Sequence, residues 1–191
     1  VVAGIFAASG QSCTAGSRLL VERKIAEPFL KLLAEKAKSI RIGDPPAEET
    51  RMGALVSRAQ RQAVLDAARA IAGEGEVLCG SLDAPEALDA ALPGGAFLAP
   101  ILLRCADPLT AHHAHATEAF GPVATLMAYD SLDEAVALVA KGEGSLVASV
   151  FTYDAEVAAA LVFGIAPSHG RVLLVDRDCA KESTGHGSPL P

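Results

Sequence analysis

Residues 123–175 decide the fold: VATLMAYDSLDEAVALVAKGEGSLVASVFTYDAEVAAALVFGIAPSHGRVLLV. Three short apolar runs in this stretch are typical of buried strands: 123–129, 146–152 and 170–175. Helical patterns separate them, one opened by the capping box of Ser131 and Glu134 and the other by Asp154, a preferred N-cap residue. Strands that alternate with helices predict the α/β class, with a mostly parallel sheet flanked by helices.

The preceding residues continue this pattern less regularly. They predict, in chain order, a buried helix end at 1–12, a strand at 18–22, an amphipathic helix at 25–40, a helix from Ser57 to Gly73, a strand at 76–79 and an extended segment at 96–103. The apolar face of helix 25–40 is expected to carry Ile25, Phe29, Leu32, Leu33, Ala37 and Ile40. Pro28 is expected in its first turn, where amides have no intrahelical acceptor. Pro100 favours an edge strand or a bulge. Residues 104–122 are predicted to be a loop.

Composition narrows the class of protein. The chain of 191 residues fits one domain, with 51% hydrophobic and 20% charged residues, unlike a disordered chain. Its net charge of −7 and lack of basic runs argue against nucleic acid or an anionic membrane as partner. It has no apolar run of about 18 residues, as a membrane span needs. Residues 1–8 are apolar but lack a basic n-region, so they are not expected to be a signal peptide. Four widely spaced cysteines without a C-x-x-C pair favour reduced thiols and a cytoplasmic location.

Cys13 is the strongest candidate for chemistry. It lies in Ser9-Gly10-Gln11-Ser12-Cys13-Thr14-Ala15-Gly16, where small residues would leave a thiol accessible at a helix-to-strand turn. A nucleophilic cysteine needs that access and a stabilised thiolate. The alternative is a small buried core cysteine, which is the interpretation we favour for Cys79 and Cys105.

Two other polar clusters are candidate sites. His112, His113 and His115 have no Cys or carboxylate partner at zinc-ligand spacing, so we predict a solvated loop and no metal site. Residues 176–184 lack periodicity and could be an exposed connection or part of a binding surface.

Four motifs resemble the aldehyde dehydrogenase superfamily. Residues 6–18 (FAASGQSCTAGSR) resemble its active-site cysteine signature, and 118–122 (EAFGP) its second signature. Residues 145–152 and 169–172 resemble its later strands, so that the similarity covers essentially the whole chain. Residues 51–57, 115–125 and 180–191 look more narrowly like the phenylacetate-degradation branch, in which an aldehyde dehydrogenase is fused to an oxepin-CoA hydrolase.

The resemblance implies an oxidoreductase that converts an aldehyde to a carboxylic acid with NAD or NADP. The Cys13 thiolate would attack the aldehyde, the thiohemiacetal would lose hydride to the nicotinamide, and water would release the acid from a thioester. The Cys13 backbone N–H would be an oxyanion donor, Glu118 would bind the nicotinamide ribose, and Phe120 would pack beside the nicotinamide. Asp176, Arg177, Asp178 and Cys179 would border the aldehyde entrance. The substrate would be a CoA-linked semialdehyde of aromatic-acid breakdown, and the full-length protein a homo-oligomer.

Parts of the family's machinery do not occur in these residues. The sequence lacks the Glu-Leu-Gly-Gly type motif of the general base, the second oxyanion donor and a G-x-G-x-x-G loop. We therefore expect residues 1–191 to be the cysteine-bearing catalytic domain of a truncated chain whose cofactor-binding half is missing, inactive by itself. Two alternatives remain open: an aldehyde dehydrogenase for an unrelated aldehyde, and a non-catalytic scaffold or interaction domain.

Overall fold

The computed structural model describes residues 1–84 and 92–179. The chain divides into two compact units, residues 1–128 and 129–191. The stretch 180–191, which contributes to the narrower resemblance, lies outside the described residues.

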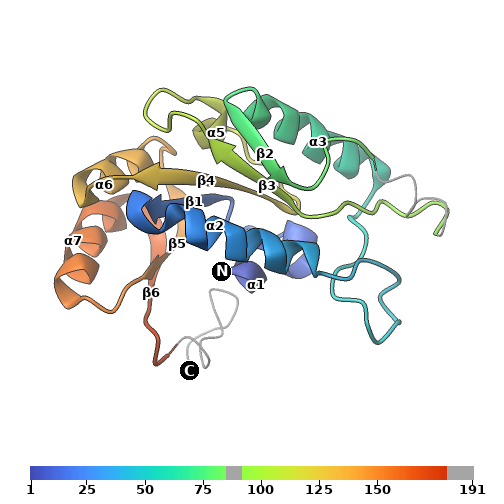
Figure 1. Cartoon of the computed structure of the whole chain (residues 1–191), viewed down its shortest axis with the longest axis horizontal. Helices are drawn as coiled ribbons and strands as arrows, with labels where there is room; N and C mark the ends of the chain where they lie inside the picture. Colours follow the sequence, from blue (N-terminus) through green and yellow to red (C-terminus); the bar gives the residue numbers. More distant parts are fainter. Residues whose placement is uncertain (85–91, 180–191) are drawn as a thin grey trace. The chain divides into compact units, whose positions relative to one another are not determined.

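The first unit contains helices at its start and strands at its centre (Figure 1). Its elements are α1 (Val2–Phe6), the 3-10 helix η1 (Ala7–Gly10), β1 (Arg18–Glu22), α2 (Arg23–Lys38), α3 (Arg58–Ala72), β2 (Gly75–Cys79), β3 (Ile101–Cys105), α5 (His113–Ala116) and β4 (Val123–Tyr129).

A four-stranded sheet in the order β1-β4-β3-β2 forms the centre of this unit (Figure 1). β3 runs parallel to β4, with Ile101 opposite Val123, and antiparallel to β2. The backbone N–H of Thr125 in β4 donates to the carbonyl oxygen of Ser17 at 2.8 Å. The start of β1, just after the Cys13 segment, is therefore held against the middle of the sheet.

Helices cover both faces of the sheet, as the sequence predicts. Side chains alternate between the faces of a strand. In β3, Ile101 and Leu103 belong to the apolar cluster that contains Val64 and Leu65 of α3. Leu102 between them belongs to the cluster that contains Ile5 of α1 and Leu33 of α2. Figure 1 shows α3 on one side of the sheet and α2 on the other.

Three helices begin at the predicted N-cap residues. The Ser57 hydroxyl accepts the Gln60 backbone N–H at 3.0 Å, and the Ser131 hydroxyl accepts that of Glu134 at 3.1 Å. Asp154 accepts two backbone N–H groups, at 2.8 and 3.1 Å. Each cap satisfies donors that the first helical turn leaves unpaired, which stabilises a helix by about 1 kcal/mol.

The second unit is a strand–helix repeat. It contains α6 (Leu132–Ala140), β5 (Ser145–Phe151), α7 (Ala155–Ile165), the 3-10 helix η2 (Ala166–Ser168) and β6 (His169–Val175). β5 and β6 pair in parallel as a separate two-stranded sheet. These strands were expected to be buried, but most of their residues are exposed or half-buried in the described chain.

Three further expectations for the first unit were wrong in detail. Pro28 does not lie in the first turn of its helix, because α2 begins at Arg23, directly after β1. Leu33 and Ala37 are buried as predicted, but Ile25 and Leu32 are 48% and 56% exposed, since α2 turns Ala26 and Leu30 inward instead. Pro100 is not in an edge strand but directly precedes β3, an inner strand, so that it interrupts no sheet hydrogen bonds. The β2–β3 pairing does contain a register shift, but it lies between Val77 and Cys79 of β2.

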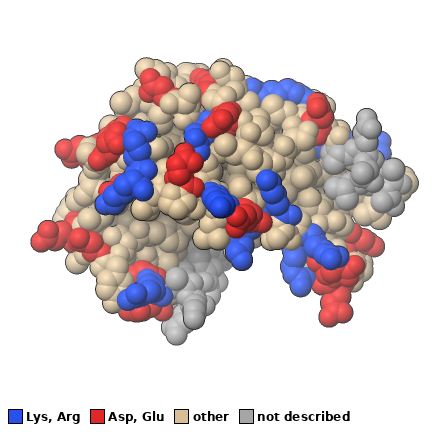
Figure 2. Space-filling view, in the orientation of Figure 1, with Lys and Arg blue, Asp and Glu red and all other residues tan. Residues whose placement is uncertain are grey.

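The surface carries charges of both signs. Figure 2 shows acidic and basic side chains interspersed over the face in view. Within residues 1–84 and 92–179, no helix combines the length and the apolar character that a membrane crossing needs.

Candidate active site

The segment before Cys13 has an unusual backbone. Ala8, Ser9 and Gly10 have φ angles of 51°, 57° and 68°, in the left-handed region. Non-glycine residues adopt this conformation at a cost, and it concentrates at functional sites. The buried Ser9 hydroxyl donates to the Gly53 carbonyl oxygen at 3.0 Å, and Gly16 N–H donates to the Gly4 carbonyl oxygen at 2.9 Å. The turn that bears Cys13 is thus anchored on both sides.

Gly10 brings this turn against the second motif. A Cβ atom at Gly10 would lie 2.2 Å from the carbonyl oxygen of Gly121 and 2.8 Å from the nitrogen of Pro122. No side chain fits there, so the two signature segments, far apart in the sequence, meet backbone to backbone.

Gly10→Ala is therefore expected to destabilise the chain by about 2–5 kcal/mol, from left-handed strain and a steric clash together. Gly94→Ala is the control, because Gly94 has a φ of 92° but no atom within 4 Å of the point where a Cβ would lie. Gly94→Ala should lower the free energy of unfolding by the left-handed strain alone, about 1–2 kcal/mol. Chemical denaturation of both variants measures the difference, and equal losses would contradict the close approach.

Cys13 has the access that a nucleophile needs. Its thiol is free and the residue is exposed, whereas Cys79 and Cys105 are buried and Cys179 is half-buried. Burial raises the pKa of the Cys79 and Cys105 thiols, which disfavours their thiolates. Within the described part of the chain, the Cys13 backbone N–H donates no hydrogen bond. Of the four cysteines, Cys13 is the one suited to meet a substrate.

Glu118 and Phe120 lie beside the cysteine turn. Both residues line a small pocket together with Gly10, Ser12 and Gly16. Its volume, about 10 Å³, is that of a single water position. Glu118 is exposed, and Phe120, with a φ of 50°, is 42% exposed.

Motif reasoning did not assign Gln60 to the site, whereas Gln11 lies within the cysteine signature. Gln60 Nε2 donates to the Phe120 carbonyl oxygen at 3.0 Å, and thereby supports a residue in a strained conformation. The Gln11 side-chain oxygen accepts the Val56 backbone N–H at 3.1 Å, so Gln11 shapes the loop. Gln60 comes from α3, which only the fold brings near the second signature.

The residues at this pocket fit one end of a dinucleotide. A carboxylate can accept hydrogen bonds from ribose hydroxyls, and an exposed ring offers a flat apolar surface to an aromatic base. Glu118 and Phe120 present these two groups at one pocket. With room for about one water, the pocket itself encloses no part of a dinucleotide, so such a ligand could be contacted only by the exposed groups at the pocket's rim.

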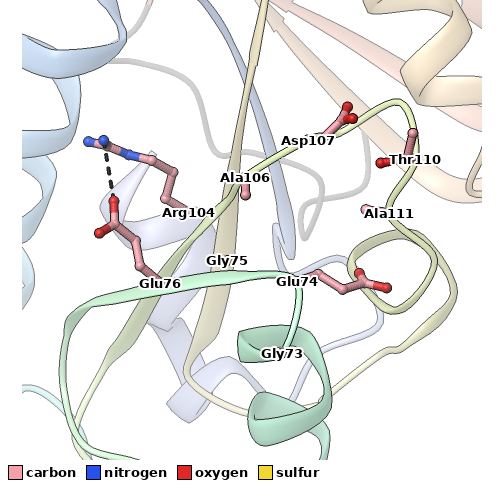
Figure 3. A pocket seen from close by; sticks show the side chains of 9 residues that line it. All are labelled: Gly73, Glu74, Gly75, Glu76, Arg104, Ala106, Asp107, Thr110 and Ala111. Atoms are coloured by element: carbon pink, nitrogen blue, oxygen red, sulfur yellow. Dashed lines mark ion pairs between the residues drawn. The ribbon is translucent and has the colours of Figure 1, made fainter.

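A larger cavity of about 580 Å³ lies elsewhere in the first unit (Figure 3). It is lined by Gly73, Glu74, Gly75, Glu76, Arg104, Ala106, Asp107, Thr110 and Ala111. Arg104 is paired with Glu76 at 3.3 Å and with Glu27 at 2.8 Å. Figure 3 shows the carboxylates of Glu74, Glu76 and Asp107 pointing in different directions. These groups do not converge on a common ligand position, and none of the motif residues lines this cavity.

The histidine segment is structured rather than an open loop. Glu74 accepts the backbone N–H groups of His112, His113 and Ala114 at 2.8–2.9 Å and so caps α5. Burial acts to raise the pKa of Glu74, but these hydrogen bonds and the nearby charge of His113 lower it overall. In the part of the chain that the structure describes, no three His, Cys, Asp or Glu residues are grouped to hold a metal ion.

The predicted entrance residues form a tight turn in the second unit. Asp176 accepts the backbone N–H groups of Asp178 and Cys179 at 2.9 and 2.8 Å. The pKa of Asp176 is lowered, first by the hydrogen bond from the Cys179 backbone N–H and then by the Cys179 thiol. The Asp178 backbone N–H and the charge of Arg177 lower it further, against an opposing effect of burial. Tyr153 donates its hydroxyl hydrogen to Asp178 at 3.0 Å, and Arg177 lies 5.4 Å from the Tyr153 ring centroid. Arg177 and Asp178 are exposed, so these two remain accessible to a ligand.

Known proteins match this arrangement over most of the chain. Residues 1–172 match the model of the aldehyde dehydrogenase family. The chain is 40% identical to 3,4-dehydroadipyl-CoA semialdehyde dehydrogenase of Aromatoleum evansii over 96% of its own length and 36% of that protein. It is 45% identical to protein MaoC of Klebsiella aerogenes over 73% of its own length and 40% of that protein. The chain thus spans less than half the length of these relatives.

Solved structures agree with the fold. PnpE from Pseudomonas sp. WBC-3 superimposes with a TM-score of 0.83 at 34% identity, over 99% of this chain and 37% of PnpE. A structure of PnpE in complex with nicotinamide adenine dinucleotide gives a TM-score of 0.80 at 35% identity, over 91% and 34% of the two chains. The predicted α/β class with a mostly parallel sheet is confirmed.

Proposed function

This chain belongs to the aldehyde dehydrogenase family of oxidoreductases, and from that premise we propose that Cys13 is the nucleophile of an NAD(P)-dependent aldehyde oxidation. The observation that carries the proposal is the meeting of two segments at one pocket. An exposed thiol lies on an anchored turn whose residues share a pocket with Glu118 and Phe120 and approach Gly121 closely. A covalent reaction next to a bound cofactor needs the nucleophile and the cofactor-holding groups to lie close together.

The reaction begins at the Cys13 sulfur. The thiolate attacks the carbonyl carbon, a C–S bond forms, and the carbonyl electron pair moves to oxygen. The Cys13 backbone N–H, which donates to no other group in the described residues, stabilises that oxyanion. When bound, NAD(P) supplies the acceptor for the hydride that leaves this tetrahedral carbon. Water then attacks the thioester on Cys13, which releases the carboxylic acid and restores the thiol.

Glu118 and Phe120 would hold the nicotinamide end of the cofactor. The Glu118 carboxylate accepts hydrogen bonds from the ribose hydroxyls, and the Phe120 ring limits the position of the nicotinamide. These two groups support NAD and NADP equally, because the two cofactors differ at the adenosine ribose.

The remaining machinery is proposed to lie outside residues 1–191. The general base, the second oxyanion donor and the cofactor cradle would come from a dinucleotide-binding half, in keeping with relatives of which this chain covers 36–40%. Residues 1–191 alone would then form a catalytic domain without turnover. The full-length protein would work as a cytoplasmic homo-oligomer, a location in keeping with the four free cysteines.

The proposed substrate is a CoA-linked semialdehyde of aromatic-acid breakdown such as phenylacetate degradation. Support comes from the 40% identity to a dehydrogenase named for a CoA-linked semialdehyde. Asp176, Arg177, Asp178 and Cys179 would help to select this substrate. The exposed Arg177 guanidinium is the group among them suited to an anionic acid or phosphate.

Aldehyde should protect Cys13 from alkylation. The chain is treated with iodoacetamide in the presence and absence of excess hexanal, and alkylation of each cysteine is followed by peptide mass spectrometry. Thiohemiacetal formation should slow alkylation of Cys13 about fivefold or more, while Cys179 serves as an internal control. Hexanol, which has no carbonyl group, should protect neither Cys13 nor Cys179 from alkylation. Equal effects on Cys13 and Cys179 would contradict the assignment.

A further inference from the structure

Arg18 and His115 form a contact between the two signature segments. Arg18, the first residue of β1, follows the cysteine turn, and His115 in α5 precedes Glu118. Arg18 Nη1 lies 3.2 Å from His115 Nδ1, across 97 residues of sequence. Burial lowers the pKa of the Arg18 guanidinium, yet arginine stays charged in proteins.

The contact determines the protonation of His115. A guanidinium can only donate hydrogen bonds, so His115 Nδ1 must accept. The ring is then neutral and carries its hydrogen on Nε2, which donates to the Pro108 carbonyl oxygen at 2.7 Å. Both ring nitrogens are engaged, which orients the imidazole between β1 and the loop that contains Pro108.

This contact complements the one at Gly10. Before Cys13, Gly10 packs against Gly121. After Cys13, Arg18 bonds His115. The segment 115–121 therefore touches the chain on both sides of Cys13, while the hydrogen bonds within the turn, such as Ala15 N–H to the Ser12 carbonyl oxygen, are local.

We propose that Arg18 and neutral His115 are positioning residues that hold the Cys13 turn in register with Glu118 and Phe120. The inference rests on the proposed function for its catalytic consequence. Neither side chain is assigned a contact with reacting atoms. Each acts by keeping the sulfur at a set distance from the groups assigned to the nicotinamide end, where a displacement of about 1 Å can cost roughly 100-fold in rate.

Two near-isosteric variants separate the two hydrogen bonds of His115. In His115→Asn, the side-chain oxygen replaces Nδ1 as acceptor for Arg18, and the bond to Pro108 is lost. In His115→Gln, the side-chain nitrogen can replace Nε2 as donor to Pro108, and the acceptor for Arg18 is lost. His112→Gln is the control, because the exposed His112 ring packs only edge-on against His113 among the described contacts.

The first measurement uses the 191-residue chain and needs no turnover. Hydrogen exchange of residues 10–17 and 117–121 should be about tenfold faster in His115→Gln, and near wild type in His115→Asn and His112→Gln. The Cys13 alkylation rate relative to Cys179 should change in His115→Gln alone. The proposal would be overturned if His115→Gln and His115→Asn exchanged hydrogen at equal rates, or if His115→Gln exchanged at the rate of the wild type. Either result would count whatever the outcome for aldehyde oxidation.

The second measurement uses a full-length protein that contains this chain. His115→Gln should lower kcat about tenfold to 100-fold with less than a twofold change in KM for the aldehyde, and His115→Asn should restore most of kcat. If both His115 variants raised KM equally without a change in kcat, Arg18 and His115 would have a structural role alone, and the positioning role would be rejected. If Cys13→Ala retained activity, the proposed function would fail while the exchange result stood.

Discussion

Replacing Cys13 by alanine is expected to abolish aldehyde oxidation in a full-length protein that contains this chain, by about 10⁴-fold or more in kcat. The physical reason is that the variant cannot form the covalent intermediate. An aldehyde carbon is planar, and it expels hydride readily only after a nucleophile has made it tetrahedral and charged its oxygen. Cys13 is exposed, and its neighbours Ser12 and Ala15 line one pocket with Glu118 and Phe120, so this is the sulfur whose loss is expected to matter.

Steady-state formation of NADPH or NADH measures this effect, and calorimetric titration with the dinucleotide measures binding separately. Binding should persist, because alanine removes no group assigned to the cofactor. Cys179→Ala is the matched control, since Cys179 is the other cysteine with some solvent exposure. Sustained turnover by Cys13→Ala, or an equal loss in Cys179→Ala, would reject Cys13 as the nucleophile.

Replacing Glu118 by glutamine is expected to slow the hydride-transfer step roughly 100-fold, with a much smaller effect on dinucleotide affinity. The carboxylate is assigned two acceptor oxygens toward the ribose hydroxyls, and an amide offers only one. A cofactor held at its adenosine end but loose at the nicotinamide would bind well and react slowly. Glu118 is exposed at the pocket beside the Cys13 turn, so this exchange leaves the core intact.

A single-turnover experiment with enzyme in excess isolates this step from product release. Glu49→Gln, another exposed acid of the first unit outside the pocket, controls for the change in net charge. An unchanged single-turnover rate in Glu118→Gln would remove Glu118 from the reaction. A loss of affinity as large as the loss of rate would point to general binding rather than to orientation of the nicotinamide.

Local chemistry determined most of the helices and strands. Ser57, Ser131 and Asp154 start helices where their side chains satisfy free amides, and the strand at 18–22 has the predicted bounds. Such features depend on residues a few positions apart, which is why the sequence reveals them. The two signatures also identified the family, and the family match over residues 1–172 confirms it. The roles of Cys13, Glu118 and Phe120 stay predictions.

Only the tertiary structure decided which surfaces face inward and which distant residues meet. The sequence correctly placed Leu33 and Ala37 on the buried face of their helix, but packing against the sheet selected Ala26 and Leu30 in place of Ile25 and Leu32.

The contacts that organise the candidate site are also long-range: Gly10 against Gly121, Gln60 on the Phe120 carbonyl oxygen, and Arg18 on His115. No local pattern marks such contacts, because they depend on the order of strands in the sheet and on the path of the loops between them. Periodicity and capping act within about one helical turn, whereas a site is assembled by packing across the whole unit.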